Sequence, residues 1–471
     1  MNIKRSNIVF IIIVTISYSC LFFSSCKQRS VEGMIIITEV AGDLRDVDHI
    51  TGNSWRYFSE SRIVALNSNK SEEQFNVLSK DFLSACSPKI SYDGNFMLFS
   101  AQKEQNDIWQ IWEMNLENLK VRQITTSSEN CIDPDYLPGD RLVFSKFTTN
   151  ENVKASHSLF TSNLDGSEIK QITFNPHTYF ASTVLKDGRL LTINKQLYPV
   201  HGDEMLMVLR PDGSKQELFY KGLKGSKLIS GGHETNDGKV LFIESGNIEK
   251  ERGDVISISY NRPLHSKINL SADINGDFYA VSPQQSGKLL VSYRISEDDR
   301  YALYEFDADN KTLSEVIYHD KDYNVLEAVV VEKKERPKKL PSEVDMSVKT
   351  GLLLCQDVNF TDIQSVENTD SSSKAVRIEV MGINSSFGIV DVEKDGSFYL
   401  KLLADTPFRI QSIDESGNVV NGPGSWLYLR PNERRGCVGC HENNEQVPRN
   451  RQPLSVKKDP ILLPLNMKDI H

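Results

Sequence analysis

The stretch CSPKISYDGNFMLFS at residues 86–100 decides the fold of this chain, because it returns at a regular interval. Residues 131–145 read CIDPDYLPGDRLVFS, with a similar turn that contains glycine and a similar alternating apolar strand that ends in Phe-Ser. The turn and strand recur at residues 186–192, 236–243 and 286–292, and the turn glycines are Gly94, Gly139, Gly188, Gly238 and Gly287. Self-similarity with a period of about fifty residues indicates a repeat protein.

Each repeat also has a second half. Residues 111–116 lead to residues 122–125, and residues 159–166 lead to residues 170–173, again as short strands with turn signals between them. A repeat therefore holds about four strands in about 40–50 residues, which is typical of a β-propeller blade. We predict an all-β fold with a six- or seven-bladed β-propeller over residues 26–332. The flanking regions 34–78 and 322–331 are expected to supply the blades beyond the five glycine-marked units.

Large aromatic side chains and two cysteines recur inside the repeats. We interpret Phe99, Trp109, Trp112 and Phe144 as core between blades rather than as ligand-stacking groups. Cys86 and Cys131 hold equivalent positions in adjacent repeats. Equivalent positions near a propeller axis can approach each other, so these two residues either form a disulfide or remain two buried thiols.

The composition changes after the last repeat. Residues 332–341 read EKKERPKKLP, a charged run with two prolines that is typical of an exposed boundary, so we place a linker at residues 333–345. An apolar run at residues 351–358 follows, and then a series of alternating segments that indicate strands. These segments lie at residues 376–380, 388–392, 397–403 and 408–413. We predict a small antiparallel β-sandwich over residues 346–430.

The C-terminal segment, residues 431–471, carries the strongest chemical motif. Residues 437–441 read CVGCH, and Cys-x-x-Cys-His is the attachment motif of c-type haem. Thiols at i and i+3 lie on one face of a helical turn, so Cys437 and Cys440 can both bond the vinyl groups of one porphyrin. The next residue, His441, is then placed to bind the iron as the proximal ligand. We predict one covalent haem c, which so short a tail can enclose only with help from the other domains.

Other readings of the two cysteines are weaker. A zinc site needs two more ligands nearby, and the next histidine is His471. A thioredoxin-like site needs a βαβ setting, which the strand pattern does not offer. The sixth iron ligand stays open, with Met467, His471, His201 and His233 as candidates.

Several side chains near the motif are candidates for contacts with the haem. Arg430, Arg434 and Arg435 either pair with haem propionates or form a solvated basic patch. Trp426 and Tyr428 are expected to pack against the haem edge or in the sandwich core.

The first 26 residues read as an export signal. Lys4 and Arg5 precede an almost wholly apolar stretch at residues 8–23, and small residues lead to Cys26. We predict a lipoprotein signal peptide at residues 1–25 and lipidation of Cys26, which anchors the protein to a membrane in the periplasm or at the outer membrane. The alternative is an uncleaved signal anchor. A net charge of −10 gives no reason to expect nucleic-acid binding.

The order of these parts resembles the alpha-subunit family of hydrazine synthase, and the repeats resemble the propeller of the Tol translocation system. The Tol-like match lies in residues 114–116 and 163–166, and the synthase-like match in residues 133–138, 231–234, 354–359, 392–399, 425–426 and 430–442. The resemblance does not carry the hydrazine-forming reaction over. That family's alpha subunit binds two c-type haems and has a tyrosine iron ligand shortly after the motif histidine. This chain has a single CxxCH, followed by ENNE at residues 442–445.

Three functions remain in view from the sequence. The first is a membrane-anchored monohaem cytochrome that carries electrons to a redox partner protein or serves as a redox subunit. The second is a haem oxidoreductase that acts on a small nitrogen or oxygen species at an open iron position. The third is a propeller-based binding module in which the haem tail is secondary.

Overall fold

The computed structural model describes residues 31–42, 57–58, 60–66, 75–149, 153, 155–247, 250–360, 374–439 and 450–465. In these ranges the chain is built from strands, from β1 (Ile35–Ala41) to β33 (Ile461–Leu463), with one short 3-10 helix at Leu454–Lys457. The predicted all-β class is therefore confirmed. Within the same ranges, no helix has the length and apolar character needed to cross a bilayer.

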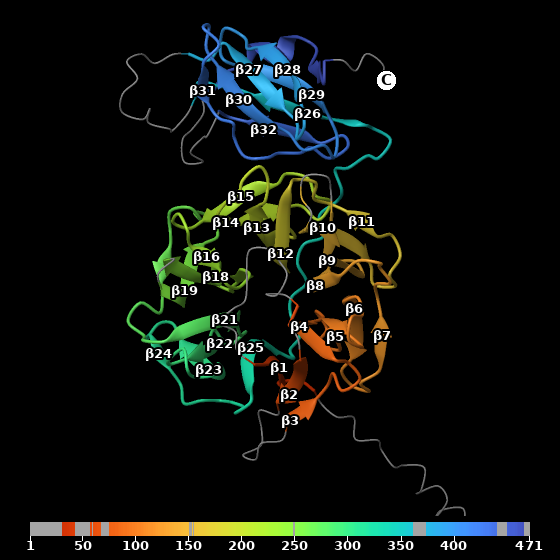
Figure 1. Cartoon of the computed structure of the whole chain (residues 1–471), viewed down its shortest axis with the longest axis vertical. Helices are drawn as coiled ribbons and strands as arrows, with labels where there is room; N and C mark the ends of the chain where they lie inside the picture. Colours follow the sequence, from red (N-terminus) through yellow and green to blue (C-terminus); the bar gives the residue numbers. More distant parts are fainter. Residues whose placement is uncertain are drawn as a thin grey trace, which may run out of the picture.

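Among the described residues, six sheets follow one another round a ring (Figure 1), which makes the fold propeller-like. The first sheet holds β1, β2 (Ser61–Leu66), β3 (Phe75–Val77) and β25 (Tyr323–Val330). The second holds β4 (Ser84–Ile90), β5 (Phe96–Gln102), β6 (Gln110–Asn115) and β7 (Val121–Gln123). The third holds β8 (Cys131–Leu137), β9 (Arg141–Thr148), β10 (Ser156–Asn163) and β11 (Lys170–Gln171).

The other three sheets of the ring follow the same antiparallel plan. The fourth holds β12 (His177–Val184), β13 (Leu190–Gln196), β14 (Glu204–Leu209) and β15 (Glu217–Lys221). The fifth holds β16 (Lys227–Leu228), β17 (His233–Glu234), β18 (Lys239–Asn247), β19 (Lys250–Ser259) and β20 (Ile268–Asn269). The sixth holds β21 (Asp277–Pro283), β22 (Leu289–Arg294), β23 (Ala302–Asp307) and β24 (Thr312–Leu313).

The first sheet closes the ring. Strand β25 pairs antiparallel with β1, with Val329 opposite Ile36, so the last strand of the ring joins the first. The flanking regions 34–78 and 322–331, which lie outside the five glycine-marked repeats, thus form one sheet together instead of one sheet each.

The repeat turns have the backbone conformation that their glycines predicted. Gly94, Gly139, Gly188, Gly238 and Gly287 all have positive φ, between 75° and 91°. Four of them lie between the first and second long strands of their sheets, and Gly238 lies between the short strand β17 and the long strand β18. A side chain disfavours this conformation, which explains why glycine marks the period.

The residues after β25 form no strand until β26 (Thr350–Cys355), and they run along the hairpin turns of the ring. The Lys334 N–H donates to the Tyr92 carbonyl at 2.9 Å, and the Lys338 N–H donates to the Lys186 carbonyl at 3.0 Å. A Cβ on Gly188 would lie 2.0 Å from the Lys338 carbonyl oxygen. The linker side chains from Lys333 to Arg336 are exposed, but the linker backbone is attached to the ring.

The repeats' aromatic residues form the core between sheets, as predicted. Phe99, Trp109, Trp112 and Phe144 are all less than a tenth exposed. Cys131 is a buried free thiol, and its Sγ contacts the Glu129 carbonyl at 3.5 Å. A disulfide between Cys86 and Cys131 is therefore not formed.

A second unit of two sheets follows the linker. One sheet orders β32 (Arg434–Cys437), β26, β29 (Phe398–Leu403) and β33, and the other orders β28 (Ser386–Asp391), β27 (Arg377–Met381), β30 (Arg409–Ile413) and β31 (Val419–Asn421). Both sheets contribute side chains to one apolar cluster. Strands β32 and β33 come from residues 431–471 and pair in parallel with β26 and β29. The prediction of a purely antiparallel unit is therefore wrong.

One buried histidine of the ring makes stability depend on pH. The His177 Nδ1–H donates to Asn194 Oδ1 at 3.0 Å, and burial lowers the pKa of His177 to about 4. The unfolded chain binds a proton that the folded chain excludes. We therefore expect the free energy of unfolding to be highest above about pH 6.5 and to lose about 2 kcal/mol by about pH 5.

Urea unfolding at pH 7 and pH 5 tests this expectation. His177→Gln should remove this part of the loss, whereas His201→Gln, at an exposed site, should keep it. An equal pH dependence in wild type and His177→Gln would contradict the assignment.

Candidate functional site

Cys437 is the member of the predicted haem site that the structure describes. It is the last residue of β32, it is half-buried, and it lies opposite Cys355 in the parallel pair of β32 with β26. The helical turn expected for the motif therefore does not include Cys437, which ends a strand. Cys440 and His441 lie outside the described residues, and so do Cys26, Met467 and His471.

The backbone around Cys437 continues the edge of the sheet. The Gln356 N–H donates to the Cys437 carbonyl at 3.0 Å, and the Asp357 N–H donates to the Val438 carbonyl at 3.1 Å. A Cβ on Gly439 would lie 2.0 Å from the Phe360 carbonyl oxygen. Glycine inside the motif is thus required for packing against the protein itself.

Two of the three arginines proposed for haem propionates already have protein partners. Arg430 is buried, pairs with Asp405 at 2.6 Å and donates to the Asp212 carbonyl at 2.9 Å. Arg435 pairs with Glu433 at 2.7 Å. Arg434 is exposed and remains a candidate. The propionate hypothesis therefore fails for Arg430 and Arg435, because buried ion pairs hold both guanidinium groups.

Trp426 and Tyr428 attach the C-terminal unit to the ring. The Trp426 Nε1–H donates to the Tyr198 carbonyl at 2.8 Å, and the Tyr428 hydroxyl lies 2.8 Å from the Gly213 carbonyl and 3.0 Å from the Ile172 carbonyl. Both side chains are buried. The expectation that they pack a haem edge or the core of the second unit is wrong, because both bond the backbone of the ring.

Glu433 connects the same two units four residues before Cys437. Its carboxylate is fully buried and accepts hydrogen bonds from the Lys215 N–H at 2.8 Å and from the Arg430 N–H at 2.7 Å, besides pairing with Arg435. Lys215 follows β14 in the fourth sheet of the ring. The strand that carries Cys437 is therefore fixed to the ring through one buried carboxylate.

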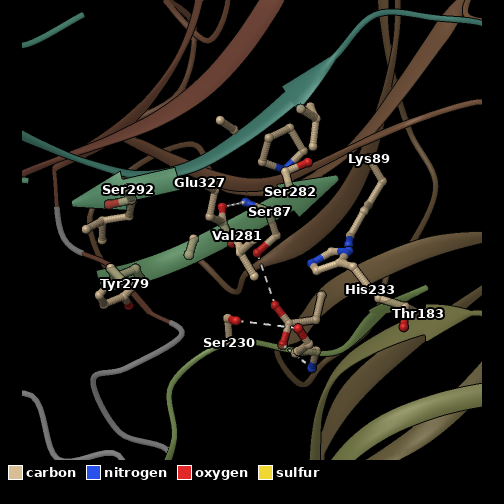
Figure 2. A pocket seen from close by; sticks show the side chains of 18 of the residues that line it. Ser87, Lys89, Thr183, Ser230, His233, Tyr279, Val281, Ser282, Ser292 and Glu327 are labelled. Carbon is tan, nitrogen blue, oxygen red and sulfur yellow. Dashed lines mark hydrogen bonds between the residues drawn. The ribbon is translucent and has the colours of Figure 1, made fainter. Parts of the chain in front are cut away.

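The described residues also form a cavity of about 80 Å³ at the centre of the ring, lined by residues from all six sheets (Figure 2). Asp133 and Glu327 supply carboxylates to its wall, and Lys89 and His233 supply nitrogen groups. Enclosure lowers the pKa of His233 to about 3, and the charges of Lys89 and Lys334 add to the effect. His233, a candidate iron ligand from the sequence, thus belongs to this cavity, and His201 is exposed.

Sequence reasoning missed this cavity as a site. The signal lies in the repeats, because Ser87, Asp133 and Ala181 occupy equivalent positions on the first strands of the second, third and fourth sheets. Strand pairing shifts register at each of these positions. The turn glycines set the period, but nothing in their spacing showed which strand faces the axis.

Comparisons with known proteins support the resemblance read from the sequence. Residues 347–442 match the family described as the hydrazine synthase alpha subunit middle domain. Hydrazine synthase subunit alpha of Kuenenia stuttgartiensis is 23% identical over 508 aligned residues, which cover 81% of this chain and 62% of that relative. This chain thus spans less than two thirds of the relative's length.

Solved structures extend the comparison to the fold. The Kuenenia stuttgartiensis hydrazine synthase structure matches with a TM-score of 0.76 at 18% identity, over 90% of this chain and 71% of that chain. TolB from Acinetobacter baumannii matches with a TM-score of 0.45 at 13% identity, over 63% of this chain and 66% of that chain.

Proposed function

We propose, for a chain that is hydrazine synthase alpha-like in sequence and fold, that it is an exported, membrane-anchored monohaem c-type cytochrome-like protein. It transfers electrons to a redox partner protein or serves as the redox subunit of a larger assembly. Cys437 and Cys440 hold the haem, His441 binds its iron, and a lipid on Cys26 holds the chain at a membrane in the periplasm or at the outer membrane.

One observation carries the haem proposal. The match to the hydrazine synthase alpha middle domain runs from residue 347 to residue 442, so it includes the whole CVGCH motif at residues 437–441. The motif therefore lies inside a segment of the chain that matches the model of a known family. A chance Cys-x-x-Cys-His is much less expected in that place.

The described residues near Cys437 fit such a group. The Cys437 thiol is half-buried at a strand end and packs against the apolar cluster of the second unit, which can keep water from one side of a porphyrin. Hydrogen bonds to the carbonyls of Cys437 and Val438 hold the backbone there. When bound, haem c supplies one-electron chemistry at its iron.

We also interpret the fold more finely. The ring of six sheets is a six-bladed β-propeller, closed by β25 and β1, and the two C-terminal sheets form a β-sandwich. The 3-10 helix and β33 lie beyond the motif and return to the sandwich. The haem then lies on the sandwich, and the propeller is a scaffold and a binding surface.

The absorbance spectrum of the full chain tests the function. We expect protein from a host that matures c-type cytochromes to give a pyridine haemochrome of c type at one haem per chain. The peptide that holds Cys437 and Cys440 should gain the mass of one haem. Protein with neither signal would contradict the proposal.

The name of the relative favours a second candidate, a haem oxidoreductase that acts on a small nitrogen species. The spin state of the ferric protein separates the two candidates, because a filled sixth position favours electron transfer and an open one permits substrate chemistry. We expect a low-spin iron that does not bind added cyanide or nitric oxide. A high-spin iron that binds both would favour the oxidoreductase.

A further inference from the structure

Two cysteines lie side by side at the ends of paired strands in the C-terminal unit. Cys355 is the last residue of β26 and Cys437 is the last residue of β32, and the parallel register places one opposite the other. Neither residue is in a disulfide in this structure. Residues that are partners in register point their side chains to the same face of a sheet, so the two thiol groups are neighbours.

Hydrogen bonds between the two backbones fix this register. The Leu352 N–H donates to the Glu433 carbonyl at 2.8 Å, and the Gln356 N–H donates to the Cys437 carbonyl at 3.0 Å. Neighbouring strands of a sheet lie about 4.8 Å apart. A disulfide fits two residues whose Cα atoms are about 4.4–6.8 Å apart. The backbone therefore already provides the spacing that a bond between Cys355 and Cys437 requires.

The two side chains share their surroundings but differ in their access to solvent. Cys355 is 2% exposed and belongs to the apolar cluster of the second unit, whereas Cys437 is half-buried and packs against the same cluster. A soluble oxidant can therefore reach Cys437 before it reaches Cys355. A bond between the two sulfur atoms would leave both side chains in contact with that cluster.

We propose that Cys355 and Cys437 form a disulfide while the chain carries no haem, and that this bond has to be reduced before Cys437 can attach haem. The inference rests on the proposed function, because export places the chain where disulfides persist and haem attachment is the competing reaction at Cys437. It adds a modification site at Cys355, which lies outside the CVGCH motif.

The reaction balances with a small disulfide, oxidised glutathione, as the oxidant. The Cys437 thiolate attacks one of its sulfur atoms and releases the first glutathione thiolate, which leaves a mixed disulfide on Cys437. The Cys355 thiolate then attacks the Cys437 sulfur and releases the second. The two cysteines lose two electrons and two protons, and the oxidant becomes two molecules of glutathione. A dithiol reductant reverses the sequence.

Peptide mass spectrometry of the haem-free full chain tests the bond. The chain is made in a host that does not mature c-type cytochromes, reduced, separated from the reductant and incubated with oxidised glutathione. We expect most chains to yield the peptide that contains Cys355 linked to the peptide that contains Cys437 and Cys440. Cys440→Ala should keep this link, which assigns the bond to Cys437.

Two further variants control the measurement. Cys355→Ser should lose the linked peptides, whereas Cys131→Ser, which removes a buried thiol of the ring, should keep them. A bond between Cys437 and Cys440 alone overturns the proposal, and so does a link that Cys440→Ala abolishes. Wild-type chains in which both Cys355 and Cys437 stay reduced overturn it as well. Circular dichroism of each variant shows that the fold is kept before the peptides are compared.

Haem yield separates this inference from the proposed function. In a host that matures c-type cytochromes, a chain with Cys440→Ala has Cys437 as its one motif thiol. Adding Cys355→Ser should raise covalent haem at least threefold, because the competing bond can no longer form. An unchanged yield overturns the competition. Wild type that forms the linked peptides but never carries haem would contradict the proposed function and leave the disulfide supported.

Discussion

Replacing both motif cysteines, Cys437→Ala together with Cys440→Ala, is expected to abolish covalently bound haem. In the proposed attachment the two thiols bond the porphyrin vinyl groups, and such covalent bonds are what would hold the haem through denaturation. We expect haem retained on a denaturing gel to fall at least tenfold. The C-terminal unit should still fold, because Cys437 is only half-buried at the end of β32.

Two other thiols give the control for this experiment. Cys355 lies opposite Cys437 in the strand pair, and Cys131 is buried in the ring. Cys355→Ala and Cys131→Ala should both keep covalent haem, since neither residue belongs to the motif. Loss of haem in all three proteins would show that folding, and not attachment, had failed. Full haem in the double variant would overturn the assignment of the site.

Glu433→Gln is expected to lower the free energy of unfolding by about 3 kcal/mol, since it removes the charge of a buried ion pair and leaves the Arg435 guanidinium without its partner. The Glu433 carboxylate accepts from Lys215, Arg430 and Arg435, which lie on both units. The glutamine side chain can accept hydrogen bonds only at its single amide oxygen. Its NH2 group would face N–H groups that also donate, so those hydrogen bonds would be lost. Urea unfolding followed by tryptophan fluorescence measures the effect, with Trp426 reporting the contact between units.

Glu343→Gln is the matched control for this change. Glu343 also pairs with Lys215, at 3.0 Å, but its side chain is 37% exposed, so its loss should cost less than about 1 kcal/mol. Equal effects of the two substitutions would show that the burial of Glu433 is not what makes it important. If Glu433→Gln unfolds like wild type, the hydrogen bonds between the units contribute little.

The strand pattern in the sequence predicted most of the fold, because residues close in sequence determine where strands and hairpin turns form. The positive φ at Gly94 and Gly188 follows from a turn that only a residue without a side chain enters freely. In the second unit, the strand expected at residues 397–403 is β29, Phe398–Leu403. Alternating apolar positions and hairpin turns act over a few residues, so a single sequence contains them.

Contacts between distant segments were not predictable in the same way. Trp426 and Tyr428 look like ordinary core residues, and only the docked units show that they bond backbone of the ring. Arg430 looked free to bind an anion, but Asp405 holds it. Asp133 belonged to a recognised segment, yet its place at the axis depends on a register shift that the sequence does not mark. Each of these depends on the arrangement of sheets in space.

The closure of the ring by β1 and β25 also dictates an order of assembly. The Thr38 hydroxyl donates to Glu327 at 2.8 Å across 289 positions of sequence, so β1 can pair with β2 early but with β25 only after most of the chain has been made. Until then β1 has an unpaired edge, which is an aggregation hazard in a growing chain. Contacts of such long range slow folding, so a holding chaperone is of most use to this protein early, before residue 330 has emerged.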